Sequence, residues 1–267
     1  MLIKRTLCDY RLLAAGTAVL LLGFVVLFMF AISSMPLDEN RFWLDLPWVR
    51  RLMSAMIGAD ISEMVTRTGF TSFVFTHPLM WIMVIGFLLT LTSGVLSGEI
   101  DRGTMDLLAT LPISRTRLYA SLSVAALLLG LPTCGTVWLG AWLGRSLLGW
   151  RDVRLDALAL LAFHLYAVYV FIACFAIAVS AACSRRTTAL VICFVFVFYA
   201  FVLNLLVAFW PAAQKIAFTG FLHYYAPLPI VRDQALRWGD VGVLLGAAAI
   251  FWTTGLAVFR RRDLPAT

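Results

Sequence analysis

The sequence predicts an all-α, polytopic integral membrane protein with six transmembrane helices. Of its 267 residues, 62% are hydrophobic and only 13% are charged, and the mean hydropathy is +0.94. A soluble domain is nearer half apolar and a quarter charged. This composition excludes an ordinary soluble globule, a disordered chain, a disulfide scaffold and a coiled coil, and it leaves a helical membrane protein.

Six charge-poor runs set the number of spans, because about 20 apolar residues are needed to cross a bilayer core. Each run must be helical, since lipid offers the backbone no hydrogen-bond partner. The first run follows basic residues as a signal peptide would, but it exceeds the core of about 7–15 residues of such a peptide and is interpreted as a retained span. The expected spans are residues 12–32, 78–97, 118–144, 157–184, 187–210 and 241–259.

The loop charges predict the orientation. Six spans place both termini on one side of the membrane, and the loops on that side carry more than twice the density of Lys and Arg found in the opposite loops. The strongest local markers are Arg185-Arg186 and Arg260–Arg262. By the positive-inside rule we expect a multi-pass protein of the cell inner (plasma) membrane with both termini cytoplasmic. Arg145, Arg151 and Arg154 run against this rule.

The net charge of +7 would point to nucleic acid in a soluble chain. Here the expected partner of the basic loops is anionic membrane lipid, and we expect no nucleic acid. The five cysteines form no CxxC pair and the three histidines are scattered, so we expect neither a disulfide framework nor a metal site.

The span centres carry no Asp, Glu, Lys or Arg. Such charges mark ion and proton paths, so their lack argues against a proton-coupled carrier and is compatible with a lipid-like or amphiphilic cargo. Asn204 and His164 are the polar exceptions, and His164 is interpreted as a packing residue with satisfied hydrogen bonds.

Two segments on the expected outer side are more than simple tethers. Residues 47–57 show helical spacing of apolar side chains and are expected to form a helix in the membrane interface. Residues 216–231 are too short and too interrupted by proline to span, and are expected to dip into the outer leaflet with Tyr224 and Tyr225 near the headgroups. Simple loop anchoring explains either segment equally well.

Residues 98–117, between the second and third spans, carry the most information. An apolar stripe at helical spacing starts at Ile100, the charged residues lie mostly off it, and Pro112 must end the helix. Ser114 is then the expected N-cap of the third span. The pattern predicts an amphipathic helix attached at both ends to spans, with Glu99 and Arg102 paired at helical spacing. It acts either as a lever on those spans or as a passive interfacial helix.

This segment resembles the coupling segment in permeases of type-2, exporter-type ABC transporters, and the tail Phe259–Leu264 is similar to the tail of that family. The matching residues are Gly98-Glu99, Gly103-Thr104, Leu107-Leu108, Pro112, Ser114 and Arg115. The six spans and the broken segment before the last one also fit the layout of the family. The resemblance implies that residues 1–267 form one transmembrane permease domain.

The resemblance further implies an export path built from two permease subunits, identical or related, and driven by two cytoplasmic ATP-binding-cassette ATPases. The implied ATPase-coupling residues are Gly98, Glu99, Asp101, Arg102, Gly103, Thr104, Leu107, Leu108, Pro112 and Arg115. Independently, a Walker A loop needs Gly-Lys-Ser/Thr, and neither Lys4 nor Lys215 follows a glycine. We therefore expect no enzymatic activity and no cofactor in this chain, with ATP and Mg²⁺ held by the partner.

Two other classes share the hydropathy. An intramembrane serine protease would need Gly-x-Ser-Gly, but Ser93-Gly94 follows Leu91-Thr92. A non-transporting scaffold subunit would not need the lever. An integral-membrane enzyme and a scaffold subunit are therefore the alternatives to a permease.

Overall fold

The computed structural model describes residues 2–34, 46–48, 67–103 and 114–262, and the regular elements in these ranges are all helices. Six stretches in these ranges are long and apolar enough to cross a membrane, which confirms the predicted all-α fold and its six spans. They are α2 (Arg11–Ser33), the run of α5 (Arg67–Phe73), η2 (Val74–Thr76) and α6 (Pro78–Val95), α9 (Arg115–Leu148), α10 (Leu155–Ala182), α11 (Arg186–Phe209) and α14 (Trp238–Arg261). The shorter elements are α1 (Leu2–Asp9), α7 (Ser97–Asp101), α12 (Pro211–Gln214), η3 (Ala217–Thr219), η4 (Phe221–Tyr224) and α13 (Pro227–Asp233).

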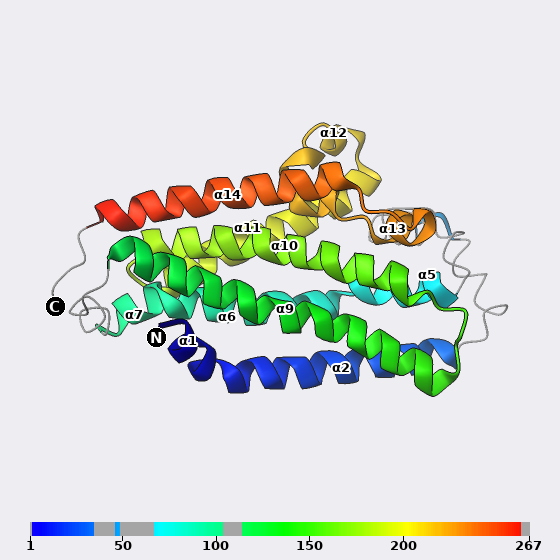
Figure 1. Cartoon of the computed structure of the whole chain (residues 1–267). Helices are drawn as coiled ribbons and strands as arrows, with labels where there is room; N and C mark the ends of the chain where they lie inside the picture. Colours follow the sequence, from blue (N-terminus) through cyan, green and yellow to red (C-terminus); the bar gives the residue numbers. More distant parts are fainter. Residues whose placement is uncertain (1, 35–45, 49–66, 104–113, 263–267) are drawn as a thin grey trace.

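Helix α10 lies at the centre of the bundle. It packs against α6, α9, α11 and α14, while α2 packs against α9 and α6 (Figure 1). Helix α1 and the last turn of α14 lie at the same end, as an even number of spans requires (Figure 1). We call this the terminal end, which also carries α7. The opposite end, with α5, α13 and the loop 149–154, is the distal end.

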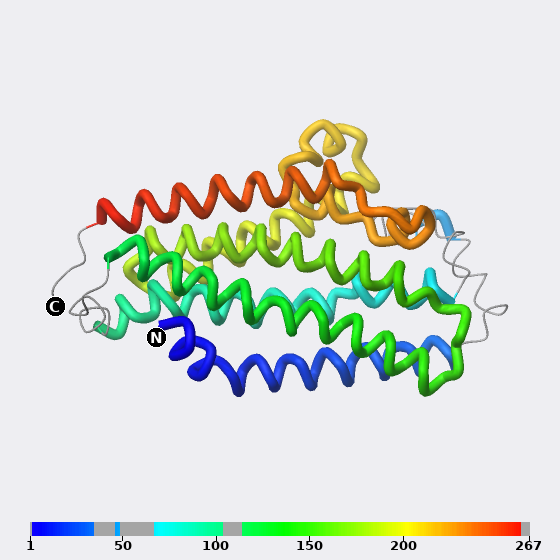
Figure 2. The backbone as a smooth tube through the Cα atoms, in the orientation of Figure 1, coloured from blue at the N-terminus to red at the C-terminus, as the bar shows by residue number. Residues whose placement is uncertain are grey.

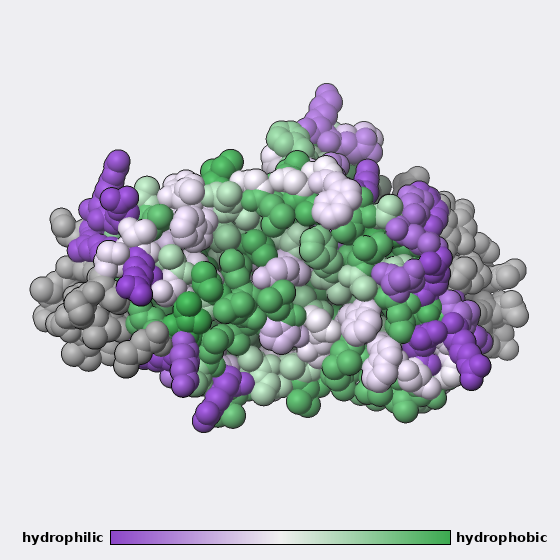
Figure 3. Space-filling model, viewed as in Figure 1, coloured by the Kyte–Doolittle hydropathy of each residue, from purple (hydrophilic) through white to green (hydrophobic). Residues whose placement is uncertain are grey.

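Burial separates the central helix from the peripheral ones. In the most apolar part of α10, 67% of residues are buried, against 22% in α2, α11 and α14. Figure 3 shows an apolar band between hydrophilic ends. With 23 residues, α2 is about 35 Å long at about 1.5 Å per residue, which matches a hydrocarbon core of about 30 Å. The exposed apolar faces of the peripheral helices therefore suit contact with lipid.

Glycines let α9 approach its neighbours closely. A Cβ atom at Gly130 would lie 2.1 Å from the Cε1 atom of Tyr169 on α10, and one at Gly140 would lie 2.8 Å from the Cβ atom of Val25 on α2. Helix α9 runs unbroken through Pro132. Because helices in lipid associate through packing, such small residues at the contacts determine which helices become neighbours.

The chain between α11 and α14 forms short helices that stand partly outside the bundle beside α14 (Figure 2). None of η3, η4 and α13 is long enough to span, as predicted for residues 216–231. Tyr225 packs inside the protein, and its expected placement near the headgroups stays a prediction. Its side chain is buried, its ring lies 5.4 Å from that of Trp81, and its hydroxyl donates to the Phe75 carbonyl oxygen at 3.3 Å. The expected helix over 47–57 lies almost entirely outside the described residues.

His164 is fully buried in α10, but its expected hydrogen bonds are missing. Within the described part of the chain, neither ring nitrogen makes a hydrogen bond of ordinary geometry, although the Tyr224 backbone and the Asp240 carboxylate lie near enough to act on the ring. The ring packs edge-on against Tyr225 at 5.3 Å between centroids. His164 is therefore a packing residue, as predicted, but an unsatisfied one, because the apolar contacts of α10 leave its polar atoms without hydrogen bonds of ordinary geometry.

Candidate functional site

The predicted coupling residues are only partly within the described structure. Gly98, Glu99, Asp101, Arg102, Gly103 and Arg115 are described. The remaining four lie outside the described residues: Thr104, Leu107, Leu108 and Pro112. The described part of the site therefore consists of residues 93–103 and the helix ends that contact them at the terminal end of the bundle.

The backbone breaks twice in this segment. Leu96 leaves the helical region with φ −121° and ψ −74°, which ends α6 and starts α7 in a new direction. Helix α7 ends at Asp101, and Gly103 has φ +69°. The prediction of one continuous helix over residues 98–112 is therefore wrong at Gly103, and residues 104–112 lie outside the described residues. Gly103 adopts the left-handed conformation that ends helices, which glycine reaches without steric cost.

Two buried serines anchor the start of α7 to the central helix. The Ser97 amide donates to the Ser180 Oγ atom at 2.9 Å, and the Ser180 hydroxyl donates to the Ser97 Oγ atom at 3.0 Å. The Ser97 hydroxyl in turn donates to the Ser93 carbonyl oxygen at 2.8 Å. Both side chains are fully buried. These bonds satisfy the backbone where α6 breaks and fix α7 to α10.

Arg186, at the start of α11, joins α11 to α6 and α7. Its amide lies 3.4 Å from the Asp101 Oδ2 atom, which places a carboxylate at the positive end of the α11 dipole. Its guanidinium donates to the Ser93 Oγ atom and to the Thr90 carbonyl oxygen, both at 3.3 Å. From the sequence, Arg186 was assigned only as a marker of orientation. Its packing role was missed because its partners lie more than 80 residues away.

Gly98 faces this arginine. A Cβ atom there would lie 3.2 Å from the Ser93 carbonyl oxygen and 3.5 Å from the Arg186 Cδ atom. A side chain at this position would therefore press on the contact between α7 and α11.

The predicted Glu99–Arg102 pair is present. The Arg102 Nη2 atom donates to the Glu99 Oε1 atom at 2.7 Å, with the Glu99 side chain 17% exposed and that of Arg102 52% exposed. A pair this exposed adds little stability. It leaves the polar surface of α7 charged and accessible at the terminal end.

The amphipathic helix α1 also contacts the site, and this contact was not predicted from the sequence. Tyr10, between α1 and α2, shares a small cavity of about 30 Å³ with Asp9, Val95 and Glu99. Burial raises the pKa of Tyr10, although the nearby Arg186 and Arg102 act in the opposite direction. The spacing of Leu2, Thr6 and Tyr10 along one helical face was the signal that could have located this helix.

The ends of α10, α14 and α9 are joined by two arginines. The Arg262 Nη1 atom donates to the carbonyl oxygens of Ala181 and Cys183, both at 2.9 Å, and the Nη2 atom donates to the Ser184 hydroxyl. Arg115 donates to the carbonyl oxygen of Arg262. Ser114 caps α9 as predicted, accepting from the Arg117 amide at 3.2 Å. A cation at the end of α10 complements the negative end of its dipole.

This arrangement can transmit displacement, since α7 is fixed to α6, α10 and α11. Nothing in it has the composition of a metal site: the described residues contain no group of three or more His, Cys, Asp or Glu side chains that could hold an ion.

Comparison with known families agrees with this architecture. The model of the ABC-2 family transporter proteins matches residues 11–264, which is nearly the whole chain. The comparison with curated proteins gives no match. Together with the six spans, the family match shows that the chain is a multi-pass membrane permease, and that family works with an ATP-binding-cassette partner. The chain therefore belongs to the ABC-2 family of transporter proteins.

Proposed function

We propose that the chain is the transmembrane subunit of an exporter. A separate ATPase drives transport by pushing on the coupling segment, residues 98–115. The observation that carries this proposal is the attachment of α7 at the terminal end. Ser97 binds Ser180 of α10, and Asp101 accepts from the amide of Arg186 on α11. A push on residues 98–103 would therefore reach two further spans besides α6, and a passive interfacial helix would not need these attachments.

In the proposed cycle, two copies of the ATPase bind ATP and Mg²⁺ and close against each other on the cytoplasmic side. Each pushes the coupling segment of one of two permease subunits, which are identical or related. The coupling residues within the described structure are Gly98, Glu99, Asp101, Arg102, Gly103 and Arg115. Thr104, Leu107, Leu108 and Pro112 complete the proposed set. The exposed Glu99–Arg102 pair then serves partner choice, since complementary charge sets specificity more than affinity.

An amphiphilic cargo suits the spans. Two adjoining cavities of about 340 and 330 Å³ lie between α6 and α11 and share Pro78, Trp81, Phe198 and Phe201 in their walls. Predominantly apolar walls with few polar groups favour ligands with a large apolar part. We propose that this aromatic groove belongs to the substrate path.

Co-purification with the ATPase and cargo-stimulated ATP hydrolysis test the coupling. We expect Glu99→Ala and Leu107→Asp to weaken ATPase binding and transport, whereas Ser146→Ala, exposed near the distal end, leaves both unchanged. Intact ATPase binding and unaltered transport in both coupling variants would remove the coupling assignment and favour a scaffold subunit. A metal-dependent activity of the purified chain without any ATPase would favour the enzyme class.

Cysteine labelling tests the orientation in the plasma membrane. We expect Thr104→Cys to react with a membrane-impermeant maleimide only from the cytoplasmic side, and Ser146→Cys only from the exterior. Both variants need a Cys8→Ser background, because Cys8 is exposed at the terminal end. The reverse pattern of labelling would contradict the proposed orientation while leaving the fold intact.

A further inference from the structure

A cavity of about 400 Å³ opens at the distal end, where three segments distant in sequence meet. Arg67, Thr68 and Gly69 come from the start of α5, and Leu228, Val231 and Arg232 from α13. Asp152 and Arg154 come from the loop between α9 and α10. Three arginines and one aspartate thus line the cavity, together with two aliphatic side chains. The proposed coupling function does not use this cavity.

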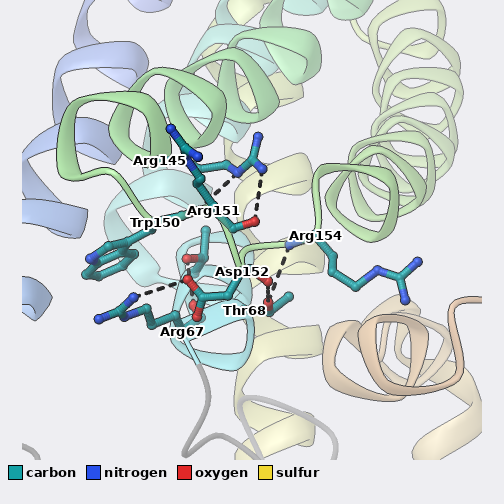
Figure 4. Close-up of polar contacts among 8 residues, drawn as sticks. Arg67, Thr68, Arg145, Trp150, Arg151, Asp152 and Arg154 are labelled. Carbon is teal, nitrogen blue, oxygen red and sulfur yellow. Dashed lines mark hydrogen bonds and ion pairs between the residues drawn. The ribbon is translucent and has the colours of Figure 1, made fainter.

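The loop beneath the cavity is held in place by several bonds (Figure 4). The Arg67 Nη1 atom donates to the Asp152 Oδ1 atom at 3.1 Å, and its guanidinium lies 5.4 Å from the ring centroid of Trp150. The Thr68 hydroxyl donates to the Asp152 carbonyl oxygen and accepts from the Arg154 amide, both at 3.4 Å. The cavity floor is therefore preorganised by contacts between α5 and the loop.

Arg145 fixes the other side of the same loop. Its Nε atom donates to the Trp150 carbonyl oxygen at 3.1 Å, and its Nη2 atom donates to the Arg151 carbonyl oxygen at 3.0 Å. In Figure 4, Arg67 and Arg154 leave the backbone on opposite sides of Asp152. Among the described lining residues, positive charge therefore lies on both sides of the carboxylate of Asp152.

The ion pairs of Arg67 and Arg154 do not use all of their N–H groups. Arg67 uses one N–H group for Asp152, and Arg154 uses two for Asp156, out of the five that a guanidinium offers. Arg232 pairs with its neighbour Asp233 at 2.8 Å. The three arginine side chains are about half exposed, and pairs of this kind exchange readily because they are worth little in water.

The accumulation of arginine at this end needs a local reason. In the proposed orientation this end is non-cytoplasmic, where cations oppose the usual orientation signal. Arg67, Arg145, Arg151 and Arg154 nevertheless gather around one loop (Figure 4), and Arg232 lines the same cavity. Arginine binds phosphate and carboxylate groups in a bidentate manner. Leu228 and Val231 add an apolar wall that suits the chain of an amphiphile.

We propose that this distal arginine cavity binds an anionic phosphate-bearing group, either the headgroup of an anionic lipid or a free phosphate. The binding chemistry rests on the cavity alone and holds for either orientation of the chain. Figure 3 shows hydrophilic residues of the distal end next to the apolar band, the level at which lipid headgroups are expected.

Native mass spectrometry of the full purified chain measures the binding of lipids to the cavity. We expect phosphatidylglycerol to bind more tightly than phosphatidylcholine, and Arg67→Gln, Arg154→Gln and Arg232→Gln together to weaken phosphatidylglycerol binding roughly tenfold or more. The matched control is Arg151→Gln, on the same loop but outside the cavity lining, which we expect to keep full affinity. Asp152→Asn removes the lining carboxylate and should tighten binding, an effect opposite in sign to that of misfolding.

Equilibrium dialysis with radiolabelled inorganic phosphate supplies the second arm. If inorganic phosphate binds and the three arginines are needed for it, the phosphate group by itself is sufficient for binding. If phosphatidylglycerol binds and inorganic phosphate does not, the cavity is a lipid site. Equal affinity for the two lipids with no phosphate binding overturns the proposal. The proposal is also overturned if the triple arginine variant keeps the same phosphatidylglycerol affinity as Arg151→Gln, or if Asp152→Asn binds phosphatidylglycerol more weakly than the parent.

Discussion

Two arginines at each end of the bundle form contacts of different kinds. At the terminal end, Arg186 and Arg262 donate to serine hydroxyls and backbone carbonyl oxygens of other helices. At the distal end, Arg154 and Arg232 form exposed pairs with aspartates one or two residues away. The first kind of contact joins helices that must move together, whereas the second leaves charge available to solvent. The contrast fits the proposed transmission of force through Arg186 and Arg262 and the proposed anion binding near Arg154 and Arg232.

Removing one arginine from each end tests this contrast most strongly. We expect Arg186→Ala to lower the free energy of unfolding by about 2–3 kcal/mol, because two partly buried charge-assisted hydrogen bonds are lost. The matched change Arg154→Ala should have no measurable effect on stability, because its pair with Asp156 is exposed. Unfolding in detergent followed by tryptophan fluorescence measures both. Equal losses in the two variants would end the distinction between the two ends.

Buried polar groups at the terminal end also differ from one inside α10 in how well they are satisfied. Ser97 and Ser180 bind each other at the terminal end, whereas His164 makes no hydrogen bond of ordinary geometry among the described residues. We expect His164→Phe to raise the free energy of unfolding by about 1 kcal/mol, since an apolar ring of similar shape removes an unsatisfied group. Ser180→Val, measured in the same assay, should lower stability. A clear loss of stability in His164→Phe would show that the imidazole has a partner in the membrane.

The smallest expected difference is in pH dependence. The pKa of Tyr10, at the terminal end, is raised above its ordinary value of 10.0 by burial. Its contribution to stability is therefore fully present below pH 10 and is lost as the pH rises toward the folded-state pKa. Tyr10→Phe should flatten the alkaline limb of a plot of melting temperature against pH. An alkaline limb that is the same in this variant and in the parent would contradict the assignment.

At the distal end the sign is opposite. The hydrogen bond from Arg232 holds the pKa of Asp233 below its ordinary value of 3.8. Its contribution is therefore present above pH 3.8 and is lost as the pH falls toward the folded-state pKa. Asp233→Asn should flatten only the acid limb of the same plot, with Tyr10→Phe as its control.

Local signals in the sequence located much of the candidate site. The i, i+3 spacing of Glu99 and Arg102 predicted their ion pair, and the serine before the third span predicted the N-cap of α9. The prediction went wrong at Gly103, because periodicity alone treats a glycine at φ +69° as one more helical residue. The roles of Arg186 and Arg262 stayed hidden, because their partners are set by helix packing rather than by spacing.

The sequence by itself determined the six spans and, because their number is even, that both termini lie at the same end of the bundle. Lipid forces each apolar run to satisfy its own backbone, so hydropathy suffices to count helices. Only the tertiary structure decided which helices are neighbours. Lipid and protein surfaces are about equally apolar, so the choice depends on shape, as where Gly130 admits Tyr169. For the same reason only the folded bundle brings Ser97 next to Ser180, and their hydrogen bond attaches α7 to the central helix α10.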